Sequence, residues 1–415
     1  MHRRPAPRPY RAPLGVQAMN LMLHKLAVSP VKVLARVAAS ILVGALVTLL
    51  LSAPLPAQAE DEYTREFRKG YEALIAGRVD EGIVSMKRCL EMRPDDSTPA
   101  YNLACAYSLK NEPDAGFEWL GRALDLGFAF SRTDSLTMLA SSDKDLANLR
   151  TDARFASVLE RFKAQHAKVD AYAATPIVYV PPALEKAEVS PLLVVLHESG
   201  DTKEGAFANG PWKQIADELG YVLLIPSGKT PTSFLPEVDP SKGMAWFASS
   251  DDYEANFWKY EKPVEDAVKA LRKERKLDPQ RVHIVGVGMG AVPAFNLAVS
   301  SPGLYKGVVS YNGWPNLRMA GAKLANAQKL GLETAWLYPS KPLGGVATMP
   351  EAEYEALLQR VEAGFKSTAL TGAVVRFEAP ADAANKPKYV DAAAVKSALA
   401  GLGAAKPAPG APSKL

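Results

Sequence analysis

The chain has 415 residues, of which 48% are hydrophobic and 23% are charged, a balance that excludes global disorder and leaves room for two or three domains. Its formal net charge of +4 comes from residues 1–59, which contain seven of the 49 Lys and Arg residues and no acidic residue. The rest of the chain carries 42 basic and 45 acidic residues, so its composition gives no support for nucleic-acid binding.

Residues 1–59 have the pattern of a secretory signal. Basic residues end at Arg36, an apolar stretch follows from Val37 to Leu51, and Ala57-Gln-Ala59 has the small side chains of a cleavage site. This stretch is shorter than the roughly 20 residues that a membrane-spanning helix needs. We expect cleavage after Ala59 and a periplasmic or secreted protein with no stable membrane span. The alternative is an uncleaved signal that anchors the chain in the inner membrane, and translation starts at Met1, Met19 or Met22.

Residues 60–165 contain an internal repeat of 34 residues and no strand pattern. Small residues recur at this period, which lets paired helices approach closely: Gly70, Gly77, Gly82 and Cys89 are followed by Ala104, Asn111, Gly116 and Ala123. The stretches Tyr101–Tyr107 and Trp119–Leu124 resemble the tetratricopeptide consensus. We predict two repeats, with a degenerate third unit or a cap up to Phe162. They would form either a groove for a protein or peptide partner or a module that packs on the following domain.

The two cysteines, Cys89 and Cys105, fall at helix positions that favour small side chains. We therefore expect buried free thiols rather than a disulfide. The sequence has no Cys-x-x-Cys motif and no Cys/His cluster, so it predicts no structural zinc and no other metal or cofactor.

Residues 172–402 alternate between short apolar runs and amphipathic segments, a pattern that predicts a doubly wound α/β domain with a parallel sheet covered on both faces. The predicted strands are 177–180, 191–197, 221–226, 282–285, 304–310, 334–338 and 373–377, and the predicted helices are 212–219, 263–276, 351–365 and 391–402. The Pro- and Ala-rich residues 403–415 are expected to be a disordered tail.

A glycine cluster, Gly286-Val-Gly288-Met-Gly290, connects the predicted strand Val282–Val285 to a small-residue helix. This is the layout of the nucleophile elbow, G-x-S-x-G. The middle position, where the serine belongs, is Gly288, and glycine has no side chain that could attack a carbonyl carbon.

The stretch Leu192 to Pro315 resembles the exported esterase branch of the α/β-hydrolase superfamily, which includes carboxylesterases. The resemblance places His197-Glu-Ser-Gly200 at the oxyanion loop and the backbone N–H of Met289 in the oxyanion hole. It also implies an acid after the strand 334–338 and a histidine after the last strand. No acid follows that strand before Glu351, and no histidine lies beyond His283.

We therefore interpret the domain as a non-catalytic relative of serine esterases that serves in binding or scaffolding. The alternative is a serine esterase with a relocated nucleophile, for which Ser199 with His197 as its base is the candidate pair; Ser310 and Ser340 also lie at predicted strand ends. His166 and His283 are expected to be structural.

A remnant oxyanion pocket is predicted from His197, Glu198, Ser199, Gly200, Gly288 and Met289, with Trp314 beside it. Backbone amides at a glycine turn favour anions, so the pocket would hold a small carboxylate, ester or sugar. Glu198 stands where the family has glycine and would repel an anion, so the alternative is a pocket filled by side chains.

Two further stretches precede the elbow. Asp251-Asp252 is expected to be a solvated acidic pair in a loop rather than a metal site. The aromatic residues of Trp246–Phe247 and Tyr253–Tyr260 would shape a substrate pocket or, as we prefer, pack against the sheet.

Overall fold

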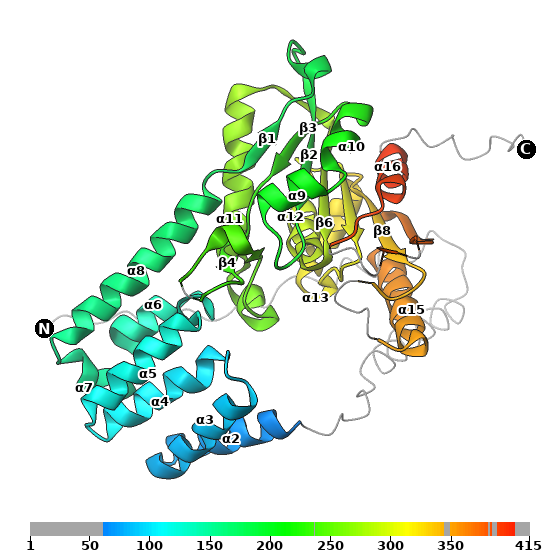
Figure 1. The fold of residues 1–415 in the computed structure, drawn as a ribbon. Coiled ribbons are helices and arrows are strands. Elements are labelled where there is room, and N and C mark those ends of the chain that lie inside the picture. The colour runs from blue at the N-terminus through cyan, green and yellow to red at the C-terminus, as the bar shows by residue number, and fades with distance from the viewer. Residues whose placement is uncertain (1–60, 236, 344–348, 381, 384–387, 403–415) are drawn as a thin grey trace, which may run out of the picture. The chain divides into compact units, whose positions relative to one another are not determined.

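The computed structural model describes residues 61–235, 237–343, 349–380, 382–383 and 388–402 (Figure 1). The predicted signal at 1–59 and the predicted tail at 403–415 lie outside the described residues. Within these ranges, no helix combines the length and the apolar composition that crossing a bilayer requires.

The first part of the described chain is helical. Its helices are α2 Glu62–Ile75, α3 Val79–Met92, α4 Ser97–Leu109, α5 Pro113–Asp125, α6 Ser135–Thr137, α7 Ala147–Arg150 and α8 Arg154–Ala173. Helix α5 begins 34 residues after α3, which is the period predicted from the sequence. Helix α8 extends well beyond Phe162, where the helical pattern was expected to end.

Small residues hold these helices close together, as the repeat pattern requires. A Cβ added at Gly70 of α2 would fall 2.7 Å from Cβ of Ser85 in α3. Cys89 and Cys105 are both buried and free, which confirms the prediction of unpaired thiols. Burial also raises the pKa of the Cys89 thiol to about 11, so it is not a reactive thiolate at neutral pH.

The second part contains a seven-stranded sheet in the order β1-β3-β2-β6-β7-β8-β9. These strands are β1 Ile177–Tyr179, β2 Ser190–Leu196, β3 Val222–Ile225, β6 Leu277–Val287, β7 Gly307–Tyr311, β8 Glu333–Pro339 and β9 Thr371–Phe377. All neighbours pair in parallel except β1, which pairs antiparallel with β3. The predicted parallel sheet is therefore present, with one antiparallel strand, β1, at its edge.

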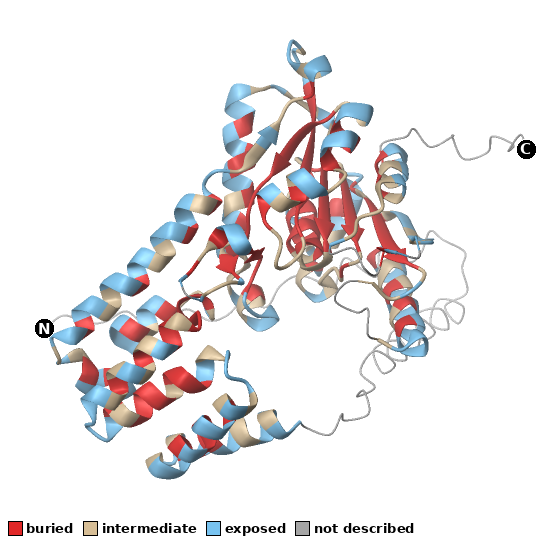
Figure 2. Ribbon diagram, viewed as in Figure 1, coloured by how far each residue is buried: buried red, intermediate tan, exposed pale blue. Residues whose placement is uncertain are grey.

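Helices cover both faces of the sheet, whose central strands are buried (Figure 2). The buried side chains of β2, β3, β6, β7 and β8 alternate between two hydrophobic clusters. Leu192, Val194 and Leu196 of β2 pack in one cluster with α11 Ser250–Glu274, α12 Ala291–Ser300, α14 Lys323–Lys329 and α15 Glu351–Thr368. Leu193 and Val195 pack in the other cluster with α10 Trp212–Leu219 and α16 Ala392–Gly401. The layered α/β architecture that was predicted is therefore present. The remaining elements are α9 Lys203–Asn209, α13 Leu317–Ala320, β4 Thr230–Pro231 and β5 Met244–Ala245.

Helix α11 differs most from its prediction. It begins at Ser250, thirteen residues before Pro263, because the Ser249 hydroxyl accepts a hydrogen bond from the Asp252 amide and acidic residues follow in the first turn. The pair Asp251-Asp252 is thus helical and not a loop. The backbone leaves the helical conformation at Asn256, where φ is −137°, so α11 consists of two helical segments that meet at a kink, and Pro263 lies in the second.

The aromatic segment before and within α11 packs into the core. Trp246, Phe247, Tyr253 and Tyr260 are all buried in the cluster that lies on the α11 face of the sheet. The preferred interpretation as packing therefore holds for these four rings, whereas Trp258 is exposed and two of the four rings also line a cavity described below.

Candidate functional site

Two adjacent parallel strands bring the predicted site together. Strand β2 is buried along its whole length and leads into His197, Glu198 and Ser199. Strand β6 leads into the turn at 288–290 and then into α12. Leu196 lies opposite Gly286, so both chains turn at the same carboxyl edge of the sheet, where ligands bind in open α/β sheets.

The elbow glycine at 290 is required by how closely these two turns approach. A Cβ added at Gly290 would fall 2.5 Å from the carbonyl oxygen of Leu196 and 2.7 Å from that of His197. The sharp strand-turn-helix geometry expected from the glycine spacing is therefore present, although no serine occupies it.

Two backbone amides, one from the predicted oxyanion loop and one from the elbow, converge on the protein's own carboxyl group. The backbone N–H of Ser199 donates to Oε1 of Glu198 at 2.9 Å, and the N–H of Met289 donates to the same oxygen at 3.2 Å. Burial raises the pKa of Glu198, and this effect exceeds the lowering by the two hydrogen bonds, which favour the charged form. The side chain of Glu198 thus satisfies both amides.

Gly288 leaves the space that Glu198 fills. A Cβ added at position 288 would fall 1.7 Å from Oε2 of Glu198, and φ at this residue is +52°, in the left-handed region that favours glycine. A side chain at position 288 would therefore require the Glu198 carboxylate to move out of this space and away from the two amides.

His197 supports the loop and does not activate Ser199. Its Nδ1 lies 2.8 Å from the carbonyl oxygen of Glu198, and its own carbonyl accepts a hydrogen bond from the Trp246 indole at 2.8 Å. The ring is buried, and burial lowers its pKa. In the part of the chain that the structure describes, its Nε2 has no hydrogen-bond partner and no bond joins it to Ser199. The fallback pair is therefore not assembled as a dyad here.

The other histidines and serines are held in structural contacts. His283 is buried in β6 with its Nδ1 2.9 Å from the Tyr221 hydroxyl, and burial lowers its pKa to about 4. His166 lies in α8 with Nε2 2.9 Å from the carbonyl oxygen of Ala129. Ser310 is buried in β7, and Ser340 donates to the carbonyl of Phe377 at 3.2 Å. Among the described residues, no three His, Cys, Asp or Glu side chains come together as metal ligands.

Two cavities meet at Glu198 and Asn312. One, of about 330 Å³, is also lined by Ser199, Tyr311, Lys388 and Tyr389. The other, of about 480 Å³, is lined on the elbow side by Gly288, Met289 and Val292 and on the opposite side by Phe247, Tyr253 and Trp314. Five of the six predicted pocket residues touch one of these cavities or a smaller one of about 190 Å³ that His197 lines.

Sequence reasoning missed two residues of this site. Asn312 follows β7 with φ of +47°, and Lys388 donates from Nζ to the carbonyl of Gly200 at 2.6 Å and to Asp201 at 3.2 Å. The Tyr311-Asn-Gly-Trp314 sequence at a strand end was a usable signal for Asn312. Lys388 carried none, because its loop is far along the chain from the oxyanion loop.

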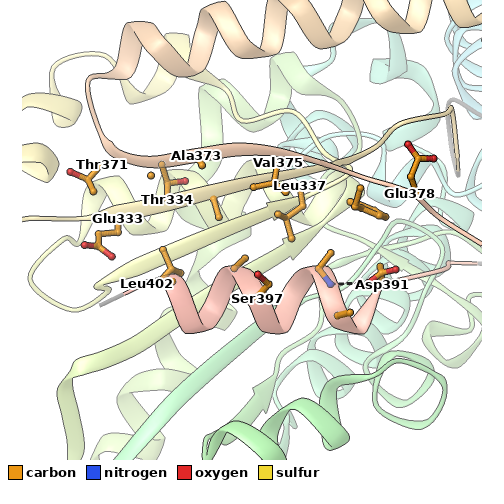
Figure 3. Close-up of a pocket in the computed structure, with 17 residues that line it drawn as sticks. Glu333, Thr334, Leu337, Thr371, Ala373, Val375, Glu378, Asp391, Ser397 and Leu402 are labelled. Carbon is orange, nitrogen blue, oxygen red and sulfur yellow. Dashed lines mark hydrogen bonds between the residues drawn. The ribbon is translucent and has the colours of Figure 1, made fainter. Parts of the chain in front are cut away.

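A larger cavity, of about 670 Å³, lies away from the elbow. Figure 3 shows it between α16 and the strands β8 and β9, with Leu337, Val375 and Leu402 on its walls. None of its lining residues belongs to the elbow or to the oxyanion loop. The volume of a cavity therefore does not identify the functional site. We place the site where polar groups converge, at Glu198.

The sheet order, the helices on both faces and the sharp glycine turn after β6 define an α/β-hydrolase fold. A family model described as Phospholipase/Carboxylesterase matches residues 183–334, and this match supports a place in the α/β-hydrolase superfamily.

Curated relatives agree with this assignment over part of the chain. The S-formylglutathione hydrolases of Mus musculus and Rattus norvegicus are each 27% identical over 140 residues, or 32% of this chain and 49% of the relative. The chain thus spans about half the length of the curated relatives it matches.

Solved structures similar to this chain include two named hydrolases. An S-formylglutathione hydrolase from Agrobacterium tumefaciens is 18% identical, with a TM-score of 0.35, over 49% of this chain and 81% of its own. The Bacillus cereus carboxylesterase is 14% identical, with a TM-score of 0.35, over 55% of this chain and 92% of its own.

Proposed function

We propose that this protein is a non-catalytic binding protein built on an esterase-like α/β-hydrolase scaffold. The observation that carries the proposal is the pair of hydrogen bonds from the Ser199 and Met289 amides to Glu198. An oxyanion hole accelerates acyl transfer by binding the developing negative charge of the substrate. Here a fixed carboxylate already occupies the donors and would repel that charge.

The absence of a nucleophile and of a base in the elbow supports the same conclusion. Gly288 offers no attacking atom, and His197 is engaged with the carbonyl of Glu198. The helices α2 to α5 would also serve in binding. As tetratricopeptide-like repeats, they would bind a protein or peptide partner. We also propose that the protein acts outside the cytoplasm, on the basis of the signal pattern at 1–59.

The alternative function is ester hydrolysis by a relocated serine. The family match and the hydrolase relatives favour it, and Ser199 lines the cavity of about 330 Å³ next to the amide donors. In that case the Ser199 hydroxyl would have to reach a base that the described residues do not provide at hydrogen-bond distance.

A serine-reactive probe separates the two functions. The chain from Glu60 onward would be incubated with a fluorophosphonate reporter and, in parallel, with a panel of short-chain nitrophenyl esters, beside an active serine esterase. We expect no labelling and no turnover above buffer. Labelling that disappears in Ser199→Ala but persists in Ser340→Ala would establish the relocated nucleophile and overturn the proposal.

A further inference from the structure

We infer that the cavity of about 480 Å³ binds an organic cation, an alkylammonium group that pairs with Oε2 of Glu198 and lies against the aromatic wall. This inference rests on the proposed binding function and names its ligand class. Replacing the elbow serine by glycine and filling the amide hole with a carboxylate has inverted the charge preference of the site from anion to cation.

Among the described residues, the cavity is lined by an acidic side chain and by no basic one. Glu198 is the single ionisable acid among its lining residues, and no Lys, Arg or His lines it within the described chain. The amides of Ser199 and Met289 both use Oε1, so Oε2 is left on the Gly288 side without a donor in the described residues. Lys388 lines two neighbouring cavities that Glu198 also lines, and its charge favours the ionised form of Glu198, but its Nζ donates to Gly200 and Asp201 and not to this carboxylate. A partly buried carboxylate that forms no ion pair among the described residues is costly, and a cationic ligand would reduce that cost.

The walls suit an organic cation rather than a metal ion. Phe247, Tyr253 and Trp314 line the cavity together with Met289 and Val292. Ring faces attract ammonium groups, and they offer a divalent metal no ligand. The aromatic positions are fixed by their own packing, because Phe247 packs at a tilt against Tyr253 with ring centroids 4.7 Å apart and Trp314 stacks on Tyr338 at 5.1 Å.

A second acceptor favours an ammonium that carries N–H groups. The side-chain nitrogen of Asn312 donates to the carbonyl of Leu343 at 3.3 Å, and this orients its oxygen. That oxygen, Oδ1, is buried and has no hydrogen-bond partner among the described residues. Because Asn312 and Ser250 line the same cavity as Glu198, a primary ammonium paired with Glu198 also has side-chain oxygens near it on the cavity wall.

The test compares probes that differ mainly in charge. The chain from Glu60 onward would be titrated by calorimetry with phenethylamine, with 2-phenylethanol as the neutral isostere and with 3-phenylpropionate as the anion, all at one ionic strength. We expect saturable binding of the amine, binding of the alcohol that is about tenfold weaker or less, and none of the anion. Equal binding of amine and alcohol would overturn the inference.

Variants locate the binding. Glu198→Gln keeps an oxygen for the two amides and removes the charge, so we expect it to fold and to bind the amine about tenfold more weakly or worse. Trp314→Leu leaves the charge and removes the ring face, with an expected loss of about threefold to tenfold. Glu353→Gln, on the exposed surface of α15, is the matched control and should bind as the wild type does. An unchanged affinity in both cavity variants would contradict the cation site.

Ester turnover measured in the same samples keeps this inference apart from the proposed function. Absence of turnover together with absence of amine binding would overturn the cation site and leave the non-catalytic function standing. Turnover that the amine inhibits competitively, with the inhibition lost in Glu198→Gln, would overturn the non-catalytic function and support the cation site.

Discussion

The carboxylate of Glu198 lies in the volume that any side chain at position 288 would need, since a Cβ on Gly288 would fall 1.7 Å from Oε2. The positions of the two residues depend on each other. Glycine admits the carboxylate, and the carboxylate bonds to the amides that surround the turn. This interdependence can be measured as a coupling free energy.

Gly288→Ala should destabilise the protein by about 2–3 kcal/mol, because it combines steric overlap with a left-handed backbone. In an E198A background the overlap is gone, and the cost should fall to about 1 kcal/mol for the backbone alone. Urea unfolding of the four proteins gives the double-mutant cycle. Gly303→Ala is the control, because a Cβ there would meet no atom within 4 Å. Additive effects at 198 and 288 would contradict the coupling.

Restoring the elbow serine should not restore hydrolysis. Gly288→Ser alone collides with Glu198, and the double change Gly288→Ser with Glu198→Gly opens the hole but supplies no base. Both variants are therefore expected to turn over nitrophenyl acetate no faster than the wild type. An increase of about tenfold or more in the double variant would mean that a base exists at the elbow.

Much of this site could be predicted from the sequence, and the reason is local. The glycine spacing at 286, 288 and 290 and the apolar strand before His197 determine the backbone turns, so the sharp turn after β6 and the Met289 amide beside the loop at 197–200 could be predicted. Glu198 was expected to repel an anionic ligand, and its hydrogen bonds to the two amides were not foreseen. Nothing local indicates that its carboxylate accepts a hydrogen bond from Met289, since that contact joins residues 91 positions apart.

Two errors have different origins. Pro263 was placed in the first turn of its helix, but the helix begins at the Ser249 cap and bends at Asn256 before it reaches the proline. The cap and the acidic first turn are local signals that the prediction overlooked. The antiparallel strand β1 is set by its pairing with β3, a long-range contact that a three-residue apolar run does not encode.

Stability should depend on the proton of Glu261. This side chain is buried in α11 and accepts hydrogen bonds from Tyr253 and from Asn296, the latter at 2.6 Å, and burial raises its pKa from 4.5 to about 7. The folded protein therefore holds a proton between these values that the unfolded chain has released. Its contribution is complete below pH 4.5 and is lost as pH rises through about 7.

Urea unfolding at pH 5 and pH 8 measures this effect. Relative to Glu261→Gln, the wild type should lose about 2–3 kcal/mol between the two pH values. Glu274→Gln, an exposed change near the end of the same helix, should keep the wild-type dependence. Parallel stability curves for wild type and Glu261→Gln would contradict the assignment.

Asp252 should hold the helical region to α11. Its carboxylate accepts from the backbone N–H and the hydroxyl of Thr133, both at 3.2 Å, and also from Asn256 at 3.0 Å and from Tyr260. Asp252→Ala leaves these donors without their acceptor and should cost about 2–3 kcal/mol in thermal or urea unfolding. Asp251→Ala, on the exposed side of the same turn, should cost less than about 0.5 kcal/mol. Equal losses in the two variants would mean that only helix capping is involved.

The mutual fit of Glu198 and Gly288 also bears on how such a domain changes over generations. A mutation to serine at position 288 displaces a carboxylate, and a mutation that removes Glu198 first leaves two amides without their acceptor. Each single change is expected to cost stability before the other has occurred, so neither is readily retained by selection. Changes at positions 198 and 288 are therefore expected to occur together among relatives of this chain.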